Sequence, residues 1–166
     1  PPPPADFLVC ESTYGDRAHK DLAATLVELT KAITETIEHK RGNVVIPAFA
    51  VGRTQDLLFL LAQLKREHKL PALDIYVDSP MALAATDVTV RHAALFDREG
   101  LDVMRWLRDE HSGFRVHFVQ EVEDSIALNS IRCGAIIISA SGMCDAGRIK
   151  HHLQHNLQHN QQYHLQ

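Results

Sequence analysis

The sequence predicts an α/β fold, a three-layer αβα sandwich built around a mainly parallel central sheet. Two observations support this prediction. Short apolar runs of strand length alternate along the chain with amphipathic stretches of helical spacing. In addition, an apolar run ends four times in a turn rich in Ser, Thr, Gly or Arg that leads directly into a helix, at residues 11–15, 47–54, 78–80 and 138–142. Parallel βα units place all such turns at the carboxyl edge of the sheet, where open α/β sheets bind their ligands.

Composition limits the possible functional classes. A chain of 166 residues, 45% of them hydrophobic, fits one folded domain. A formal net charge of −4 provides no general attraction for nucleic acid, so a polyanion would have to be held by a few local groups. No apolar run approaches the ~20 residues needed to span a bilayer, which predicts a soluble cytoplasmic protein without membrane contact. The cysteines, Cys10, Cys133 and Cys144, form no metal-spaced pair, and we expect reduced thiols, with Cys10 and Cys133 buried in the core.

The first half of the chain is expected to alternate strands and helices after an irregular start. Residues 1–6 open with four prolines, which cannot join a regular ladder, and are expected to be a linker or a cut end. Apolar runs predict the strands, and Leu and Ile at three- and four-residue spacings predict the helices. In order, the predicted elements are a strand at 7–11, a helix over 21–40, a strand at 43–49, a helix over 54–69 and a strand at 74–78.

The second half continues this alternation up to a polar tail. The predicted elements are helices over 81–96 and 101–110, a strand at 114–119, a helix over 123–132, a strand at 135–139 and a last helix from about residue 146. The run at 135–139 consists almost entirely of Ala and Ile, which is typical of a central parallel strand buried on both faces. The domain is expected to cover residues 7–157, and the Gln- and His-rich residues 158–166 to be a disordered or added tail.

Two kinds of charged side chain at the carboxyl edge are candidates for chemistry. Glu11 ends an apolar strand and brings a carboxylate to this edge, where it could orient a catalytic histidine or bind a metal. Alternatively, Glu11 is an ordinary strand-terminal carboxylate held by the backbone N–H groups that follow it. Arg53 and Arg148 each follow a glycine at a predicted helix start. A helix N-terminus combined with a guanidinium group is suited to phosphate binding.

Hydroxyl groups at the same edge can donate hydrogen bonds to phosphate oxygens, or they can simply cap the helices. These hydroxyls belong to Ser12, Thr13, Ser79, Ser139 and Ser141. A nucleophilic serine and a dinucleotide site are disfavoured, because the sequence lacks the Gly-x-Ser-x-Gly and Gly-x-Gly-x-x-Gly patterns. The Walker A pattern is also absent.

The eleven histidines do not form a zinc signature. A hydrolytic zinc site gathers about three protein ligands from rigid elements and leaves one position open. His151 and His155 lie four residues apart and would share a helix face, but no neighbouring cysteine or carboxylate completes a site. The sequence therefore predicts no metal site and no cofactor within the chain itself.

Four motifs occur in an order and spacing that resemble one known family. They are ESTYGDRAH at residues 11–19, PAFAVGRTQ at 47–55, VDSPMA at 77–82, and SASGMC at 139–144 followed by GR at 147–148 and HHL at 151–153. They are similar to the motifs of the beta-CASP region of the metallo-beta-lactamase RNA nucleases, a group that includes RNase J-like enzymes and cleavage and polyadenylation endonucleases. The resemblance is to the bacterial or archaeal form and extends over residues 7–157.

The resemblance implies a role for this region in a larger enzyme. In that family the beta-CASP region is an α/β domain inserted into a metallo-beta-lactamase fold, and an RNA strand passes between the two over a site with two zinc ions. By resemblance, Glu11 is the acidic residue that orients a histidine acting as general acid. Arg53, Arg148 and the turn at 139–142, including Gly142, would contact the RNA backbone. The implied partners are RNA and the lactamase half of the same parent protein.

The departures from the family pattern imply that the chain does not cleave RNA alone. The zinc-binding His-x-His-x-Asp-His signature and the later Ser-Ala-His-x-Asp histidines are both absent. The leading hypothesis is therefore the RNA-clamping domain of a zinc-dependent ribonuclease, with the zinc ligands elsewhere in the parent protein. Two alternatives remain: an independent mononucleotide-binding domain of doubly wound type, and a pure interaction domain whose turns only cap helices.

Overall fold

The computed structural model describes residues 3–17, 21–107 and 112–159. Its centre is a four-stranded sheet in the order β1-β4-β2-β3, and every pair of neighbouring strands is parallel. The strands are β1 (Val44–Pro47), β2 (Asp74–Asp78), β3 (Arg115–Val119) and β4 (Ala135–Ser139). All five residues of β4 are buried, as expected for a central strand. The predicted parallel α/β sheet is confirmed, and β2 and β4 have the predicted bounds.

Six α-helices connect and cover the strands within the described residues. They are α1 (Leu22–Thr34), α2 (Arg53–Arg66), α3 (Pro80–Arg91), α4 (Arg98–Leu107), α5 (Val122–Ala127) and α6 (Ile149–His159). Helix α1 continues as the π-helical turn η1 (Glu35–His39), and the 3-10 turns η2 (Ala93–Leu95) and η4 (Leu128–Ser130) follow α3 and α5. The start of α3 shows how sequence places these boundaries: Ser79 Oγ caps the helix by accepting from Ala82 N, and Pro80 occupies the first helical position.

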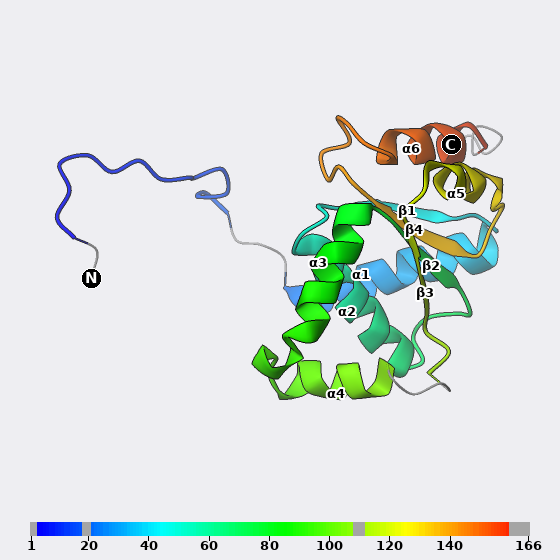
Figure 1. The fold of residues 1–166 in the computed structure, drawn as a ribbon, viewed down its shortest axis with the longest axis horizontal. Coiled ribbons are helices and arrows are strands. Elements are labelled where there is room, and N and C mark those ends of the chain that lie inside the picture. Colours follow the sequence, from blue (N-terminus) through cyan, green and yellow to red (C-terminus); the bar gives the residue numbers. More distant parts are fainter. Residues whose placement is uncertain (1–2, 18–20, 108–111, 160–166) are drawn as a thin grey trace.

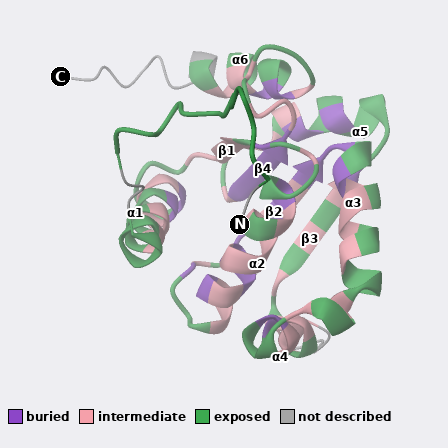
Figure 2. Cartoon of the chain, turned by 90° about the vertical axis from the view of Figure 1, so that its left-hand side faces the viewer, coloured by how far each residue is buried: buried purple, intermediate pink, exposed green. Residues whose placement is uncertain are grey.

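Different helices pack on the two faces of the sheet, which gives the three predicted layers. On one face, side chains of α1, η1 and α2 pack on alternate strand residues such as Ile75, Ile136 and Ile138. On the opposite face, Leu128 of η4 packs on Ile137 and its neighbours. Alternation of strand side chains between the two faces explains this division. Figure 1 shows α5 and α6 on one side of the sheet and α1 and α2 on the other, and Figure 2 shows the buried residues gathered on the central strands.

The predicted first strand is wrong. Residues 7–11 have no regular secondary structure, and Phe7, Leu8 and Val9 are 83–96% exposed. Figure 1 shows this N-terminal arm, residues 3–17, extending away from the sheet. The apolar run has the composition of a strand, but a strand also needs a neighbouring ladder, and no described strand pairs with it.

Smaller differences concern cysteines and helix ends. Cys10 and Cys133 are exposed rather than buried, because Cys10 lies in the arm and Cys133 in the turn before β4. Helix α6 extends to His159, so the predicted tail overlaps its last two residues, and residues 160–166 lie outside the described part of the chain. Within the described ranges, no helix has the length and apolar character needed to traverse a membrane.

Candidate functional site at the carboxyl edge of the sheet

The ends of three strands lie side by side at one edge, which we call the carboxyl edge. Ser139 at the end of β4 is in register with Pro47 of β1 and with Asp78 of β2. The next residue after β1, Ala48, donates its N–H to Ser139 O over 3.0 Å. The loops that follow residues 47, 78 and 139 therefore start next to one another, as the parallel topology predicts.

Arg53 stands at the start of α2, directly after Gly52 with a φ of 83°. The backbone N–H groups at this helix start already have partners: Gly52 N donates to Gln55 Oε1 at 2.7 Å, Arg53 N to Val51 O at 3.2 Å and Thr54 N to Phe49 O at 3.2 Å. The exposed group that remains for an anion is the Arg53 guanidinium. Phosphate contact at this position would therefore depend on the side chain more than on a backbone cradle.

The loop after β4, residues 140–148, is called the rim loop below. The Ser141 hydroxyl donates to Asp145 Oδ1 at 2.7 Å and accepts from Met143 N at 3.2 Å. Gly142 lies against the loop that follows β1, because a Cβ atom on it would come within 3.1 Å of Phe49 N and 3.2 Å of the Phe49 ring. Since Phe49 also accepts the Thr54 bond at the start of α2, the rim loop and the Arg53 turn are neighbours.

A buried cluster centred on Asp78 supports this edge from the side of α5 and α6. Asp78 is 1% exposed; its Oδ1 accepts from Arg148 Nη1 at 2.7 Å, and its Oδ2 accepts from His152 Nε2 at 2.6 Å and Ser125 Oγ at 2.5 Å. Arg148 Nη2 also donates to Gln120 O at 2.7 Å. We call Asp78, Ser125, Arg148 and His152 the Asp78 clasp. The guanidinium predicted to bind phosphate is thus engaged inside the protein, with 24% of its side chain exposed.

The clasp determines the protonation of Asp78. Burial alone raises the pKa of this carboxyl, but the hydrogen bonds from His152, Ser125 and Arg148 and the charge of Arg148 outweigh burial, so the pKa lies below its usual value. A carboxyl whose pKa is depressed by folding stabilises the native state above the pKa of the unfolded chain, and this contribution is lost as the pH falls below it.

We therefore expect the stability difference between the wild type and Asp78→Asn to be largest at neutral pH and to shrink below about pH 4, the usual pKa of aspartate. Urea unfolding of both proteins from pH 7 to pH 3 measures this difference, and the titration of the other carboxyl groups cancels in it. A difference that stays constant over the whole range would show that folding does not change the pKa of Asp78, which would contradict the lowered pKa.

The remaining predicted site residues occupy two different environments. Ser139 Oγ donates to Asp78 O at 3.1 Å, and both Ser79 and Ser139 are buried. Glu11, Ser12 and Thr13 are exposed on the N-terminal arm, and the described residues show no bond from them to the carboxyl edge. Hydrogen bonds from the Thr13 side chain and from Thr13 N, which donates to Glu11 Oε1 at 2.6 Å, lower the pKa of Glu11. Glu11 is thus bonded to a backbone N–H that follows it in the sequence, on an arm that forms no strand.

Exposed apolar side chains occur at the carboxyl edge, a feature that the sequence did not reveal. Phe49 and Val51 after β1, Met81 in the first turn of α3 and Met143 in the rim loop are 55–72% exposed. A shallow groove of about 610 Å³ between the start of α2 and α3 lies beside them and is lined by Val51, Met81 and Val88, among others. Large apolar groups gathered on one surface commonly mark a contact with another protein surface.

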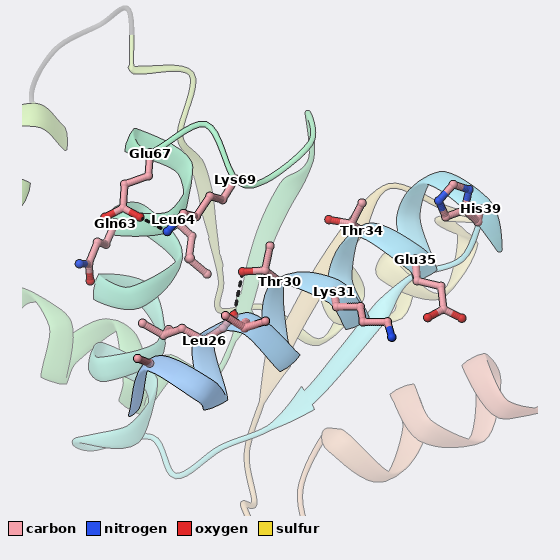
Figure 3. A pocket seen from close by; sticks show the side chains of 12 residues that line it. Leu26, Thr30, Lys31, Thr34, Glu35, His39, Gln63, Leu64, Glu67 and Lys69 are labelled. Carbon is pink, nitrogen blue, oxygen red and sulfur yellow. Dashed lines mark hydrogen bonds and ion pairs between the residues drawn. The ribbon is translucent and has the colours of Figure 1, made fainter. Parts of the chain in front are cut away.

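A second groove, of about 730 Å³, lies away from the predicted site residues. It runs between α1 with η1 and the C-terminal half of α2, with Leu26, Val27 and Leu64 in its walls. Figure 3 shows charged side chains around it, among them Lys31, Glu35, Glu67 and Lys69. None of the candidate site residues lines this groove, so it provides no support for their chemistry.

The described residues contain no group of three or more His, Cys, Asp or Glu side chains arranged to hold a metal ion. His152, one of the clustered histidines, has both ring nitrogens within hydrogen-bonding distance of protein oxygens, Asp78 Oδ2 and Asn129 Oδ1. The donor sets of this part of the chain therefore do not fit the zinc ions that the family resemblance implies.

Comparison with known proteins identifies the family. The sequence model of the Beta-Casp domain matches residues 54–163. The chain is 36% identical over 156 residues to "Ribonuclease TTHA0252" of Thermus thermophilus, with 92% of this chain and 35% of that protein covered. It is 31% identical over 154 residues to an "RNase J-like protein" of Methanocaldococcus jannaschii, covering 90% of this chain and 34% of that protein. With "Endoribonuclease YSH1" of Yarrowia lipolytica it shares 27% identity over 149 residues, 89% of this chain and 17% of that protein.

These relatives are named as ribonucleases, and the chain spans about a third of the length of the first two. The matched region begins one residue after Arg53 and contains the rest of α2, the turns after β2 and β4, and the whole Asp78 clasp. The chain belongs to the Beta-Casp domain family of ribonucleases.

Proposed function

We propose that this chain is the RNA-gripping domain of a ribonuclease whose metal ligands lie in other parts of the parent protein. The observation that carries the proposal is the meeting of the Arg53 turn and the rim loop at one edge of the sheet, through Phe49 and Gly142. Relatives named as ribonucleases support RNA as the ligand. If the parent enzyme uses two zinc ions, these would supply the hydrolytic chemistry, and the described residues would not hold them.

The proposed RNA contacts differ in how directly they reach the strand. The exposed Arg53 guanidinium and the backbone at Gly142 meet phosphate oxygens directly. The Ser141 hydroxyl has a single proton, which it donates to Asp145 Oδ1, and it joins them by exchanging that bond for one to a phosphate oxygen. Arg148 adds positive charge from the end of the rim loop while it remains bonded to Asp78. The buried hydroxyls of Ser79 and Ser139 contribute by shaping the turns. These contacts are sequence-tolerant because phosphates carry no base identity.

We further propose that the lactamase half of the parent protein covers the carboxyl edge. The exposed apolar side chains of Phe49, Val51, Met81 and Met143 favour a protein surface there over water. The same argument applies to the N-terminal arm, because Phe7, Leu8 and Val9 are apolar and almost fully exposed. Docking of the arm on that half would fix Glu11, Ser12 and Thr13 beside the RNA path, where Glu11 would hold a catalytic histidine by a hydrogen bond.

Replacing Arg53 with alanine tests the phosphate contact. Loss of one contact to single-stranded RNA is expected to reduce the slope of log K against log salt by about 0.7 and to weaken binding similarly for all sequences. Fluorescence anisotropy of a labelled RNA oligonucleotide, titrated with the chain at several salt concentrations, measures both quantities.

Arg98→Ala is a matched control, because Arg98 is the first residue of α4 and is exposed like Arg53. The bond from Gln63 Nε2 to Glu99 Oε1 places this helix start beside the far half of α2, about 15 Å along the helix from Arg53. Equal salt slopes for Arg53→Ala, Arg98→Ala and the wild type would remove Arg53 from the interface. Saturable binding of a mononucleotide, unaffected by RNA length, would instead support the mononucleotide alternative.

A further inference from the structure

The rim loop is attached at both ends to the same residue of the neighbouring strand. Ser139, directly before the loop, donates its hydroxyl to Asp78 O at 3.1 Å. Arg148, the last residue of the loop, donates from Nη1 to Asp78 Oδ1 at 2.7 Å. The first loop residue, Ala140, also accepts from Ile149 N at 3.1 Å. The loop is therefore closed at its base, and its base is fixed to β2.

The second carboxylate oxygen of Asp78 fixes the helices that precede and follow β4 in the chain. Oδ2 accepts from Ser125 of α5 and from His152 of α6. Because an ionised carboxylate only accepts hydrogen bonds, His152 Nε2 carries a proton and donates it to Asp78 Oδ2. His152 is fully buried, so RNA does not reach its side chain. Helix α6 follows the loop directly, and its position sets the position of the loop end.

Stability alone does not require such a cluster. A buried ion pair adds little stability compared with apolar side chains of similar volume, because both charges lose their hydration. Charged hydrogen bonds do provide fixed directions and short distances, and all three donors of the clasp use them on one carboxylate. The clasp is therefore suited to fix the relative positions of the groups that it joins.

We propose that Asp78, Ser125 and His152 are positioning residues for RNA binding. These three residues hold the rim loop so that Ser141 and Gly142 meet the phosphates, and the three themselves do not touch the RNA. This inference rests on the RNA-binding function proposed above. Arg148 links the two roles, because it belongs both to the clasp and to the loop.

The test compares two adjacent histidines of α6. His152→Leu fills the buried position with an apolar side chain of similar size and removes the bond to Asp78. His151→Leu makes the same chemical change at an exposed position. We expect His152→Leu to weaken binding of a single-stranded RNA oligonucleotide about tenfold, the effect of losing one hydrogen bond to a charged group. Amide hydrogen exchange over residues 140–148 is expected to become faster while the strands stay protected.

Conservative variants separate a loss of positioning from a general loss of folding. His152→Gln can present an amide N–H toward Asp78, and we expect it to recover most of the RNA affinity. Ser125→Ala removes one donor and leaves the other two, so a smaller loss is expected if His152→Leu fails to fold. A wild-type chain that does not bind RNA would overturn the proposed function. RNA binding by the wild type, with unchanged affinity and loop exchange in His152→Leu and Ser125→Ala, would overturn the positioning role alone.

Discussion

Replacing Asp78 with alanine is expected to lower the free energy of unfolding by about 3–5 kcal/mol, a large part of the stability of a domain of this size. The substitution removes the acceptor for Arg148, His152 and Ser125 at once. Because this site is buried, water does not replace the lost carboxylate, and a guanidinium charge is left without its counter-ion. Urea unfolding followed by circular dichroism measures the loss as a shift of the midpoint at unchanged m-value.

Asp74→Ala is a matched control on the same strand. Asp74 also accepts from an arginine and a histidine, with Arg115 Nε at 2.6 Å and His117 Nε2 at 3.1 Å. Those partners are 60% and 48% exposed, so the pair lies in water and is expected to contribute about 1 kcal/mol or less. Similar losses of unfolding free energy for Asp74→Ala and Asp78→Ala would mean that burial does not increase the contribution of the clasp to stability.

The strands show where sequence reasoning works and where it fails. Residues 135–139 and 74–78 were predicted with their observed bounds, because each is a compact apolar run that ends in a polar residue. Residues 7–11 have a similar composition but lie outside the sheet. Strand propensity is local, whereas the ladder that a strand needs comes from distant residues. No local pattern distinguishes a strand that finds its partner within the chain from one that does not.

The candidate site was likewise predictable from the sequence only in part. The meeting of the Arg53 turn and the rim loop followed from parallel topology alone. The Asp78 clasp was missed, since its members come from three separate places in the sequence, residues 78, 125 and 148–152. One signal was available: Ile149, His152, Leu153 and Asn156 occupy the inward side of α6, at helical spacing. A histidine on such a stripe is buried and needs a polar partner, and Asp78, at the end of an apolar strand, is a carboxylate suited to that role.

Gly147→Ala is expected to cost about 2–5 kcal/mol of unfolding free energy, from two additive causes. Gly147 has a φ of 81°, a conformation that is strained for alanine. In addition, its Cβ atom would lie 2.5 Å from Ala140 O and 3.0 Å from Ser141 N, which are backbone atoms on the opposite side of the rim loop. The loop must open to accept the methyl group, which weakens the bond from Ile149 N to Ala140 O.

Gly134→Ala separates the two causes. Gly134 has a φ of 88°, but a Cβ atom on it would meet no atom within 4 Å. Its substitution is expected to cost only the conformational part, about 1–2 kcal/mol. Thermal and urea unfolding of both variants measure the difference, and RNA titration adds a functional readout. Because the steric contact lies inside the rim loop, Gly147→Ala should also weaken RNA binding, whereas Gly134→Ala should leave it unchanged. Equal unfolding costs for the two variants would show that the rim loop is free to open, and the close contact at Gly147 would then have no role in fixing the carboxyl edge.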